Sequence, residues 1–171
     1  MITAGGENLA ERVHALLDAG AEVLIREPTL PPGLPLDRVM LHARMPGAAQ
    51  VAHALHLPGG ADVAAWRARF RGPIGVSAHS EEEARAALEA GATTVFLSPV
   101  FAARHGRPAL GPASLRGLLA LGGVRPAHAP VLHAAGAAGA AVLSGVWEAP
   151  DPVASARDYL GAFAVRCGRS G

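Results

Sequence analysis

Hydrophobic and polar positions mark out one complete strand, helix and strand unit between residues 73 and 99. A short apolar run at 73–77 is followed by Ser80 and Glu83, which are spaced as a capping box that opens a helix with an acidic first turn. Gly91 ends that helix, and residues 94–97 are β-branched or apolar enough to form a buried strand. Two strands joined through a helix run parallel with a right-handed crossover, so the pattern predicts a βαβ unit.

Similar apolar runs and helix-length segments lie on both sides of this unit. Further strands are predicted at residues 1–3, 23–25, 39–41, 52–57 and 140–143. Helices are predicted at 9–17, 62–70, 126–135 and from Asp151 and Pro152 onwards, with at most two helical turns over 114–119. Ala-Gly-Ala recurs at 19–21, 90–92 and 135–137, each time at a helix end. Those intervals approximate multiples of about 22 to 24 residues, which is the spacing of short βα units.

This pattern predicts an α/β fold, a (β/α)8 TIM barrel trimmed so that one or more helices are replaced by loops. Residues 28–35 contain four prolines, so a loop stands where a crossover helix is expected. An open, doubly wound sheet is the alternative fold. With 171 residues, the chain is expected to form a single domain over 1–171.

Composition and charge narrow the classes of partner. All 15 basic residues are arginine, and the net charge is +1, so nothing in the overall charge favours nucleic acid or an anionic membrane. The single Cys167 excludes an intrachain disulfide framework and fits a reducing compartment. Because no apolar run reaches the roughly 20 residues of a membrane span, we expect a cytoplasmic protein.

In such a barrel a site is expected at the carboxyl ends of the strands, with phosphate held after strands 7 and 8. The loops there begin with Gly122-Gly123 and Ser144-Gly145, whose bare backbone amides can approach an anion. Gly-Gly alone is more often a tight turn, so the prediction depends on the two loops being neighbours. The other polar residues at strand ends are Arg26, Glu27, His42, Arg44, Ser77, His79 and Ser98.

Histidine is the natural proton carrier near neutral pH, and this chain has eight. His79 lies one residue before a helix cap, where it could act as donor or proton carrier or merely bond the backbone at a corner. His105 lies in the loop 101–112 and is either a lid residue or a solvated one. No spacing along the chain resembles a set of metal ligands or a Ser-His-Asp arrangement.

Six segments together resemble the thiamine-phosphate synthase/TenI superfamily, in the order in which that family has them. They are Leu24-Ile-Arg-Glu27, Leu55-His-Leu-Pro-Gly-Gly60, Gly75-Val-Ser-Ala-His-Ser80, Ser98-Pro-Val-Phe101, Leu121-Gly-Gly-Val124 and Ala141-Val-Leu-Ser-Gly145. The resemblance implies a (β/α)8 barrel and one of two activities. Synthases join a pyrimidine diphosphate to a thiazole phosphate with magnesium, whereas TenI-type tautomerases aromatise a carboxythiazole phosphate by moving a proton without metal.

Departures from the family pattern separate these activities. Pro28 stands where the synthases have a lysine after Arg26-Glu27, and Leu41-His42-Ala43 offers no carboxylate where they have Asn-Asp. Pro58-Gly-Gly-Ala-Asp62 is closer to TenI proteins than to the synthase pattern Gly-Gln-Glu-Asp. With so few carboxylates there is little to bind magnesium, so neither a metal nor another cofactor is expected.

The resemblance also implies roles for single residues. Pro99 occupies the position of the TenI catalytic histidine, so another proton carrier is needed. The candidates are His79, then His105 or His42, with Glu27 as a second group. Gly122, Gly123, Ser144 and Gly145 stand at the family's phosphate-binding positions, and Arg26, Ser77 and Ser98 are the further candidates for ligand contacts.

Three functions follow as hypotheses. The first is a TenI-type enzyme acting on a thiazole phosphate carboxylate by proton transfer, and the second is a non-catalytic or regulatory relative that keeps the phosphate site. The third is a thiamine-phosphate synthase with relocated metal ligands. In each case the expected partner is a small phosphorylated thiazole, and a homodimer could cover barrel wall left bare by missing helices.

Overall fold

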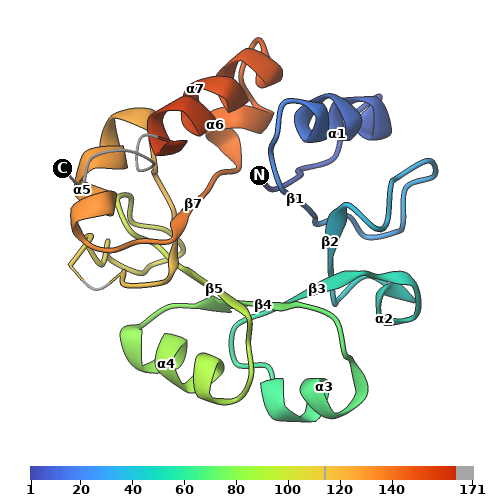
Figure 1. Cartoon of the computed structure of the whole chain (residues 1–171), viewed down its shortest axis with the longest axis horizontal. Helices are drawn as coiled ribbons and strands as arrows, with labels where there is room; N and C mark the ends of the chain where they lie inside the picture. The colour runs from blue at the N-terminus through green and yellow to red at the C-terminus, as the bar shows by residue number, and fades with distance from the viewer. Residues whose placement is uncertain (114, 165–171) are drawn as a thin grey trace, which may run out of the picture.

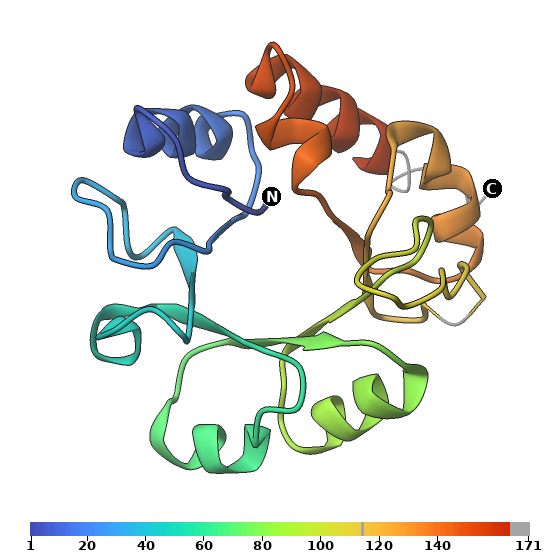
Figure 2. The same cartoon turned by 180° about the vertical axis from the view of Figure 1, so that it is seen from behind.

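In the computed structural model, which describes residues 1–113 and 115–164, seven parallel strands form one sheet that curls into a ring. Strand follows strand in sequence order, and the helices lie outside the ring (Figures 1 and 2). The strands are β1 (Val23–Ile25), β2 (Val39–His42), β3 (Ala54–Leu57), β4 (Ile74–Ala78), β5 (Thr94–Leu97), β6 (Leu119–Leu121) and β7 (Gly139–Ala141). The helices are α1 (Leu9–Asp18), α2 (Ala48–Val51), α3 (Val63–Arg69), α4 (Glu81–Glu89), α5 (Ala129–Ala134), α6 (Ser144–Trp147) and α7 (Pro152–Ala164), with a 3₁₀ turn η1 (Pro126–His128).

The amino-terminal segment closes the ring. Ile2 forms a one-residue parallel bridge with Leu24 of β1, and its amide donates to the carbonyl of Val142, directly after β7, at 2.9 Å. The buried hydroxyl of Thr3 donates to Glu27 Oε1 at 2.6 Å and accepts from the amide of Arg26. The predicted first strand is therefore present as a short stub, and the trimmed (β/α)8 barrel is confirmed over the doubly wound alternative.

Local signals placed most helices correctly. Ser80 Oγ accepts from the amide of Glu83 at 3.1 Å, and Asp62 Oδ1 accepts from the amide of Ala65 at 2.9 Å. Asp151 caps α7 in the same way, through the amide of Ala154. In each case the cap satisfies one of the amides that a helix start leaves without an intrahelical partner.

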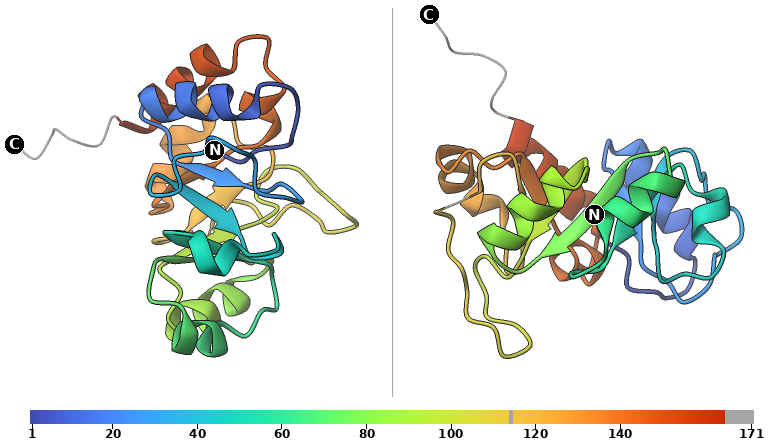
Figure 3. Two further views of the ribbon diagram at one scale, coloured as in Figure 1. Left: turned by 90° about the vertical axis from the view of Figure 1, so that its right-hand side faces the viewer. Right: turned by 90° about the horizontal axis from the view of Figure 1, so that it is seen from below.

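Two connections lack a helix in the described part of the chain. The loop from Arg26 to Arg38 follows β1 as predicted, and the segment from Ser98 to Leu118 follows β5. The tip of the latter projects beyond the ring at the carboxyl ends of the strands (Figure 3, yellow). The barrel is thus trimmed at two places.

The predicted helical turns over 114–119 are wrong for the described residues 115–119. Leu115 and Leu118 are buried, while Gly117 takes a positive φ of 74° and its amide donates to Gly136. Arg116 forms an antiparallel bridge with Ala137. The amide of Leu118 donates to the carbonyl of Leu115, so the chain makes a tight turn here and then enters β6. The predicted strand over 52–57 starts two residues late, because the short helix α2 occupies the chain up to Val51.

Apolar side chains fill two layers. The larger cluster lies between the strands and the surrounding helices, and a small cluster of Ile2, Leu24, Phe96 and Ala141 fills the lumen of the ring. Gly75 faces this lumen, where a β-carbon would lie 3.0 Å from Met40 Sδ and 3.1 Å from Phe96 Cε2. The lumen is a packed interior, as in barrels of this class.

Contacts among Arg12, Trp147 and Gly5 form a clamp that joins α1 and the segment before it to α6, where the barrel closes. Arg12 of α1 donates from Nη2 to the carbonyl of Trp147 at 2.7 Å, and its guanidinium lies 4.2 Å from the centre of the Trp147 ring. The indole Nε1 donates in turn to the carbonyl of Gly5. None of the helices described spans enough apolar residues to cross a membrane.

Candidate functional site

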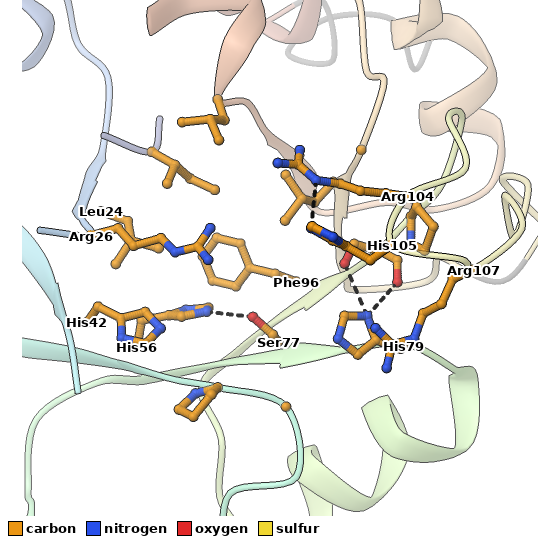
Figure 4. A pocket seen from close by; sticks show the side chains of 18 of the residues that line it. Leu24, Arg26, His42, His56, Ser77, His79, Phe96, Arg104, His105 and Arg107 are labelled. Carbon is orange, nitrogen blue, oxygen red and sulfur yellow. Dashed lines mark hydrogen bonds between the residues drawn. The ribbon is translucent and has the colours of Figure 1, made fainter. Parts of the chain in front are cut away.

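A pocket of about 500 Å³, the mouth pocket, opens at the carboxyl ends of the strands, and its lining is cationic. Side chains converge on it from the strand ends and from the loop after β5 (Figure 4). Its polar and charged lining residues are Arg26, Arg44, Arg104, Arg107, His42, His56, His79, His105, Ser77, Ser98 and Glu83. Four arginines against one carboxylate make the pocket suited to an anionic ligand.

The four arginines have no carboxylate partners within the residues described. The ion pair that the described residues do form joins Arg38 to Asp18 at 3.6 Å, and neither residue lines the pocket. Arg104 and Arg107 form an antiparallel bridge and exchange both backbone hydrogen bonds, at 3.0 and 2.9 Å. Like charges that face each other across such a bridge repel, and an anion between them would relieve this repulsion.

His105 lies at the tip of that hairpin. It has a φ of 50° and the following Gly106 a φ of 75°, so the two residues form a turn with positive φ at both central positions, as in type I′ hairpins. The Nε2 atom of His105 accepts from Arg104 Nε at 3.3 Å, and the side chain is exposed. The structure therefore places this predicted residue at the pocket, on an exposed hairpin.

His79 also lines the pocket and is held from two sides. Its amide donates to Glu83 Oε2 at 2.7 Å, and its Nδ1 lies 2.9 Å from the carbonyl of Ser98. Because a carbonyl only accepts, Nδ1 carries the proton in the neutral ring and Nε2 keeps a free lone pair. Gly59 leaves room beside this atom, since a β-carbon there would lie 3.5 Å from it. His79 is thus oriented as a base toward the pocket.

His42, at the end of β2, is buried and neutral. Burial, followed by the nearby charges of Arg26 and Arg44, lowers its pKa. Its Nδ1 accepts from the amide of Arg44 at 3.2 Å, so the proton of the neutral ring is on Nε2. His42 is therefore a hydrogen-bond donor in this pocket, not a base.

His56 is a pocket residue that the sequence reasoning missed. It lies on β3 with 3% of its surface exposed, and its Nε2 is 2.9 Å from Ser77 Oγ. The ring packs edge-on against Phe96 at 4.5 Å and lies 5.6 Å from the ring of His42. Burial, then the proximity of His42 and Arg26, lowers the pKa of His56 to about 3. The floor of the pocket is therefore a pair of neutral imidazoles.

The two glycine-bearing loops are neighbours, as the phosphate prediction requires. Tyr159 of α7 donates to the carbonyl of Val124 at 2.8 Å, and a β-carbon on Gly145 would collide with the same hydroxyl. Gly122 lines the pocket, whereas Gly123, Ser144 and Gly145 are not among its lining residues. Gly123 packs against Ala102 with a φ of 70°. Phosphate binding by these loops stays a prediction.

Glu27 lies away from the pocket. Its Oε1 accepts from both the hydroxyl of Thr3 and the amide of Gly5, at 2.6 and 2.9 Å. These bonds tie the amino-terminal stub to the end of β1. In the structure Glu27 therefore helps to close the barrel and does not contact the pocket.

The residues at the pocket do not fit the magnesium that the family resemblance implies for the synthases. Hard divalent cations need carboxylate or carbonyl oxygens. Asp62 caps α3 and lies outside the pocket lining, and Glu83 accepts from the amide of His79. Across residues 1–113 and 115–164, no group of three or more histidine, cysteine or acidic side chains is arranged to hold a metal.

A second cavity of about 710 Å³ opens at the opposite end of the ring, around the amino-terminal ends of the strands. Leu24 and Phe96 line both this cavity and the mouth pocket. Together with the other members of the small apolar cluster, these two side chains form a partition across the lumen.

Comparisons of the sequence with known proteins point to one family. A family model described as thiamine monophosphate synthase matches residues 37–146. A thiamine-phosphate synthase of Geobacillus thermodenitrificans is 39% identical over 48% of this chain and 43% of its own length. The thiamine biosynthesis bifunctional protein ThiM/ThiE of Symbiobacterium thermophilum is 35% identical over 93% of this chain and 39% of its own length. This chain thus spans less than half the length of either relative.

Solved structures show the same fold. A thiamine phosphate pyrophosphorylase from Pyrococcus furiosus superposes with a TM-score of 0.81 at 23% identity, covering 98% of this chain and 95% of that one. A 3-hexulose-6-phosphate synthase superposes with a TM-score of 0.61 at 18% identity, over 94% and 98% of the two chains. At such identities the likeness concerns the fold alone.

Proposed function

The chain belongs to the thiamine monophosphate synthase family, and on that premise we propose that it binds a phosphorylated carboxythiazole of thiamine biosynthesis and aromatises it by metal-free proton transfer. The observation that carries this proposal is the mouth pocket itself. It combines four arginines without carboxylate partners with one histidine whose lone pair faces the cavity. A ligand with a phosphate and a carboxylate matches that charge.

His79 is the proton carrier in this proposal. Its Nε2 lone pair accepts the proton from the thiazole ring, and the resulting imidazolium returns it to the exocyclic carbon, so that no proton is gained or lost overall. The carbonyl of Ser98 fixes the ring orientation through Nδ1, and this bond strengthens when the ring becomes charged. Neutral His42 and the arginines hold the anionic substituents while the proton moves.

Aromatisation of the exocyclic tautomer, followed by absorbance with and without EDTA, tests this function. We expect a rate above buffer that EDTA leaves unchanged, and a loss of about 10²- to 10⁴-fold in His79→Gln. His14→Gln is the matched control, because His14 is exposed and bonds the carbonyl of Gly33 outside the pocket. A rate equal to buffer with intact binding, measured by calorimetry, would instead favour the non-catalytic relative.

The second candidate is the synthase reaction, which is favoured by the names of the relatives. Arginines can bind a diphosphate bidentately, so the pocket can accept such a group without the carboxylates that hold magnesium. Incubation with the pyrimidine diphosphate and the thiazole phosphate, with and without magnesium, separates the two. A homodimer and a cytoplasmic location stay predictions, and sedimentation would test the first.

A further inference from the structure

One ring nitrogen of His56 has no hydrogen-bond partner among the residues that the structure describes. This nitrogen, Nδ1, is buried, and a β-carbon added to Gly75 would lie 3.0 Å from it. The other nitrogen, Nε2, contacts Ser77 Oγ at 2.9 Å (Figure 4). Such a geometry leaves two neutral tautomers, which differ in the atom that is buried without a partner.

The two tautomers differ in the free energy lost by burying an unpaired atom. If Nδ1 carried the proton, a buried N–H would be left without an acceptor, and orphaned N–H groups are the rarer and costlier defect in folded proteins. If Nε2 carries it, only a lone pair is left unpaired, and the N–H donates to Ser77. No acceptor among the described residues lies within hydrogen-bonding distance of Nδ1. The structure therefore favours the proton on Nε2.

The bond from His56 determines where the hydroxyl hydrogen of Ser77 points. A hydroxyl has one hydrogen, and an oxygen that already accepts from an imidazole must donate in another direction. Ser77 lines the mouth pocket, and its hydroxyl donates to no other residue that the structure describes. The free direction therefore leads toward whatever occupies the pocket.

We propose that His56 is a positioning residue which, by donating from Nε2 to Ser77 Oγ, directs the hydroxyl hydrogen of Ser77 away from His56 so that it donates to an acceptor atom of the ligand. The ligand class is one that presents a ring nitrogen, carboxylate or phosphate oxygen at that point. The inference rests on the proposed function only for the identity of that ligand. Burial also keeps His56 neutral, which maintains one tautomer across the neutral pH range.

Nitrogen NMR on the ligand-free protein tests the tautomer directly. Long-range ¹H–¹⁵N spectra distinguish a protonated from an unprotonated ring nitrogen, and His56→Gln identifies the signals. We expect Nε2 protonated and Nδ1 unprotonated. The reverse pattern overturns the proposal, whatever the protein binds.

A double-mutant cycle tests the coupling, with thiazole phosphate as the probe in calorimetry and inorganic phosphate as the second probe. Ser77→Ala should weaken binding about 10-fold, because a hydrogen bond to a charged acceptor is lost. His56→Leu should cost a similar factor, yet add nothing in the Ser77→Ala background. His56→Gln keeps an N–H near the same place and should restore most of the affinity.

A merely structural His56 would give another result. His56→Leu would then weaken binding by the same factor in both backgrounds, and that outcome refutes the coupling. Urea midpoints of all four proteins show whether each is folded. Failure of the wild type to bind thiazole phosphate, with the expected tautomer and coupled phosphate binding, would count against the proposed substrate and leave the role of His56 supported.

Discussion

Lowering the pH should unfold this protein in part through one buried side chain. His56 has a pKa of about 3 in the folded chain, against about 6.5 for an ordinary histidine. Between these values the unfolded chain binds a proton that the folded chain does not. Stability from this residue is therefore fully present above about pH 6.5 and is lost progressively as the pH falls toward 3.

The magnitude follows from the same shift. Each pH unit below the unfolded pKa costs about 1.4 kcal/mol, so the folded state should lose roughly 2.5 kcal/mol from His56 by about pH 4.5. His42 changes stability in the same direction, because burial and two arginines lower its pKa too. For a small domain this loss is a large part of the total free energy of unfolding.

Urea unfolding at about pH 7, 5.5 and 4.5, followed by circular dichroism, measures the effect. His56→Gln replaces the titrating ring by an uncharged amide and should flatten the pH dependence by roughly 2.5 kcal/mol over that range. His53→Gln is the matched control, because His53 is exposed at the start of β3 and should leave the slope unchanged. If wild type and His56→Gln lost stability in parallel as the pH falls, the reasoning that His56 stays neutral in the folded chain would be refuted.

Two further substitutions test the packing. Gly75→Ala places a β-carbon 3.0 to 3.1 Å from three side chains of the lumen and should destabilise the fold by about 1–3 kcal/mol in urea unfolding. Gly161→Ala, at an open position in α7, should be neutral or stabilising by up to about 1 kcal/mol, and equal effects at both sites would contradict the packing argument. Arg12→Met removes the hydrogen bond to the carbonyl of Trp147 and the contact with its ring, so we expect a loss of about 1–3 kcal/mol and a lower thermal midpoint. An unchanged midpoint would show that the clamp does not stabilise the closure.

Short-range signals in the sequence predicted the βα units and most helix starts, and the six segments that resemble the thiamine-phosphate synthase/TenI superfamily favoured the barrel over the open sheet. The caps at Ser80, Asp62 and Asp151 depend on residues three apart, so they can be read without knowing the fold. The helical turns predicted over 114–119 are absent from the described residues 115–119, where the amide of Gly117 donates to Gly136, a contact that no local pattern records.

The candidate site was harder to predict from sequence. His56 lies on a strand whose four residues are all buried, so period-two alternation cannot tell the lumen face from the helix-covered face. The arginines of the pocket come from three separate segments, with Arg104 and Arg107 in one hairpin and Arg26 and Arg44 after β1 and β2, and these segments meet only when the ring closes. His105-Gly106 was the overlooked signal that could most easily have been used. His-Gly can supply positive φ at both central positions of a tight turn, so the pair predicts a hairpin.

The apolar partition in the lumen has a consequence for the molecule as a whole. Backbone encloses the ring, and a small cluster of apolar side chains separates the two cavities at its ends. Because Leu24 and Phe96 line both cavities, shortening either side chain would thin this partition from both sides. The mouth pocket is thus isolated from the opposite end by side-chain volume, and the aromatic residue that packs against His56 is also part of the seal.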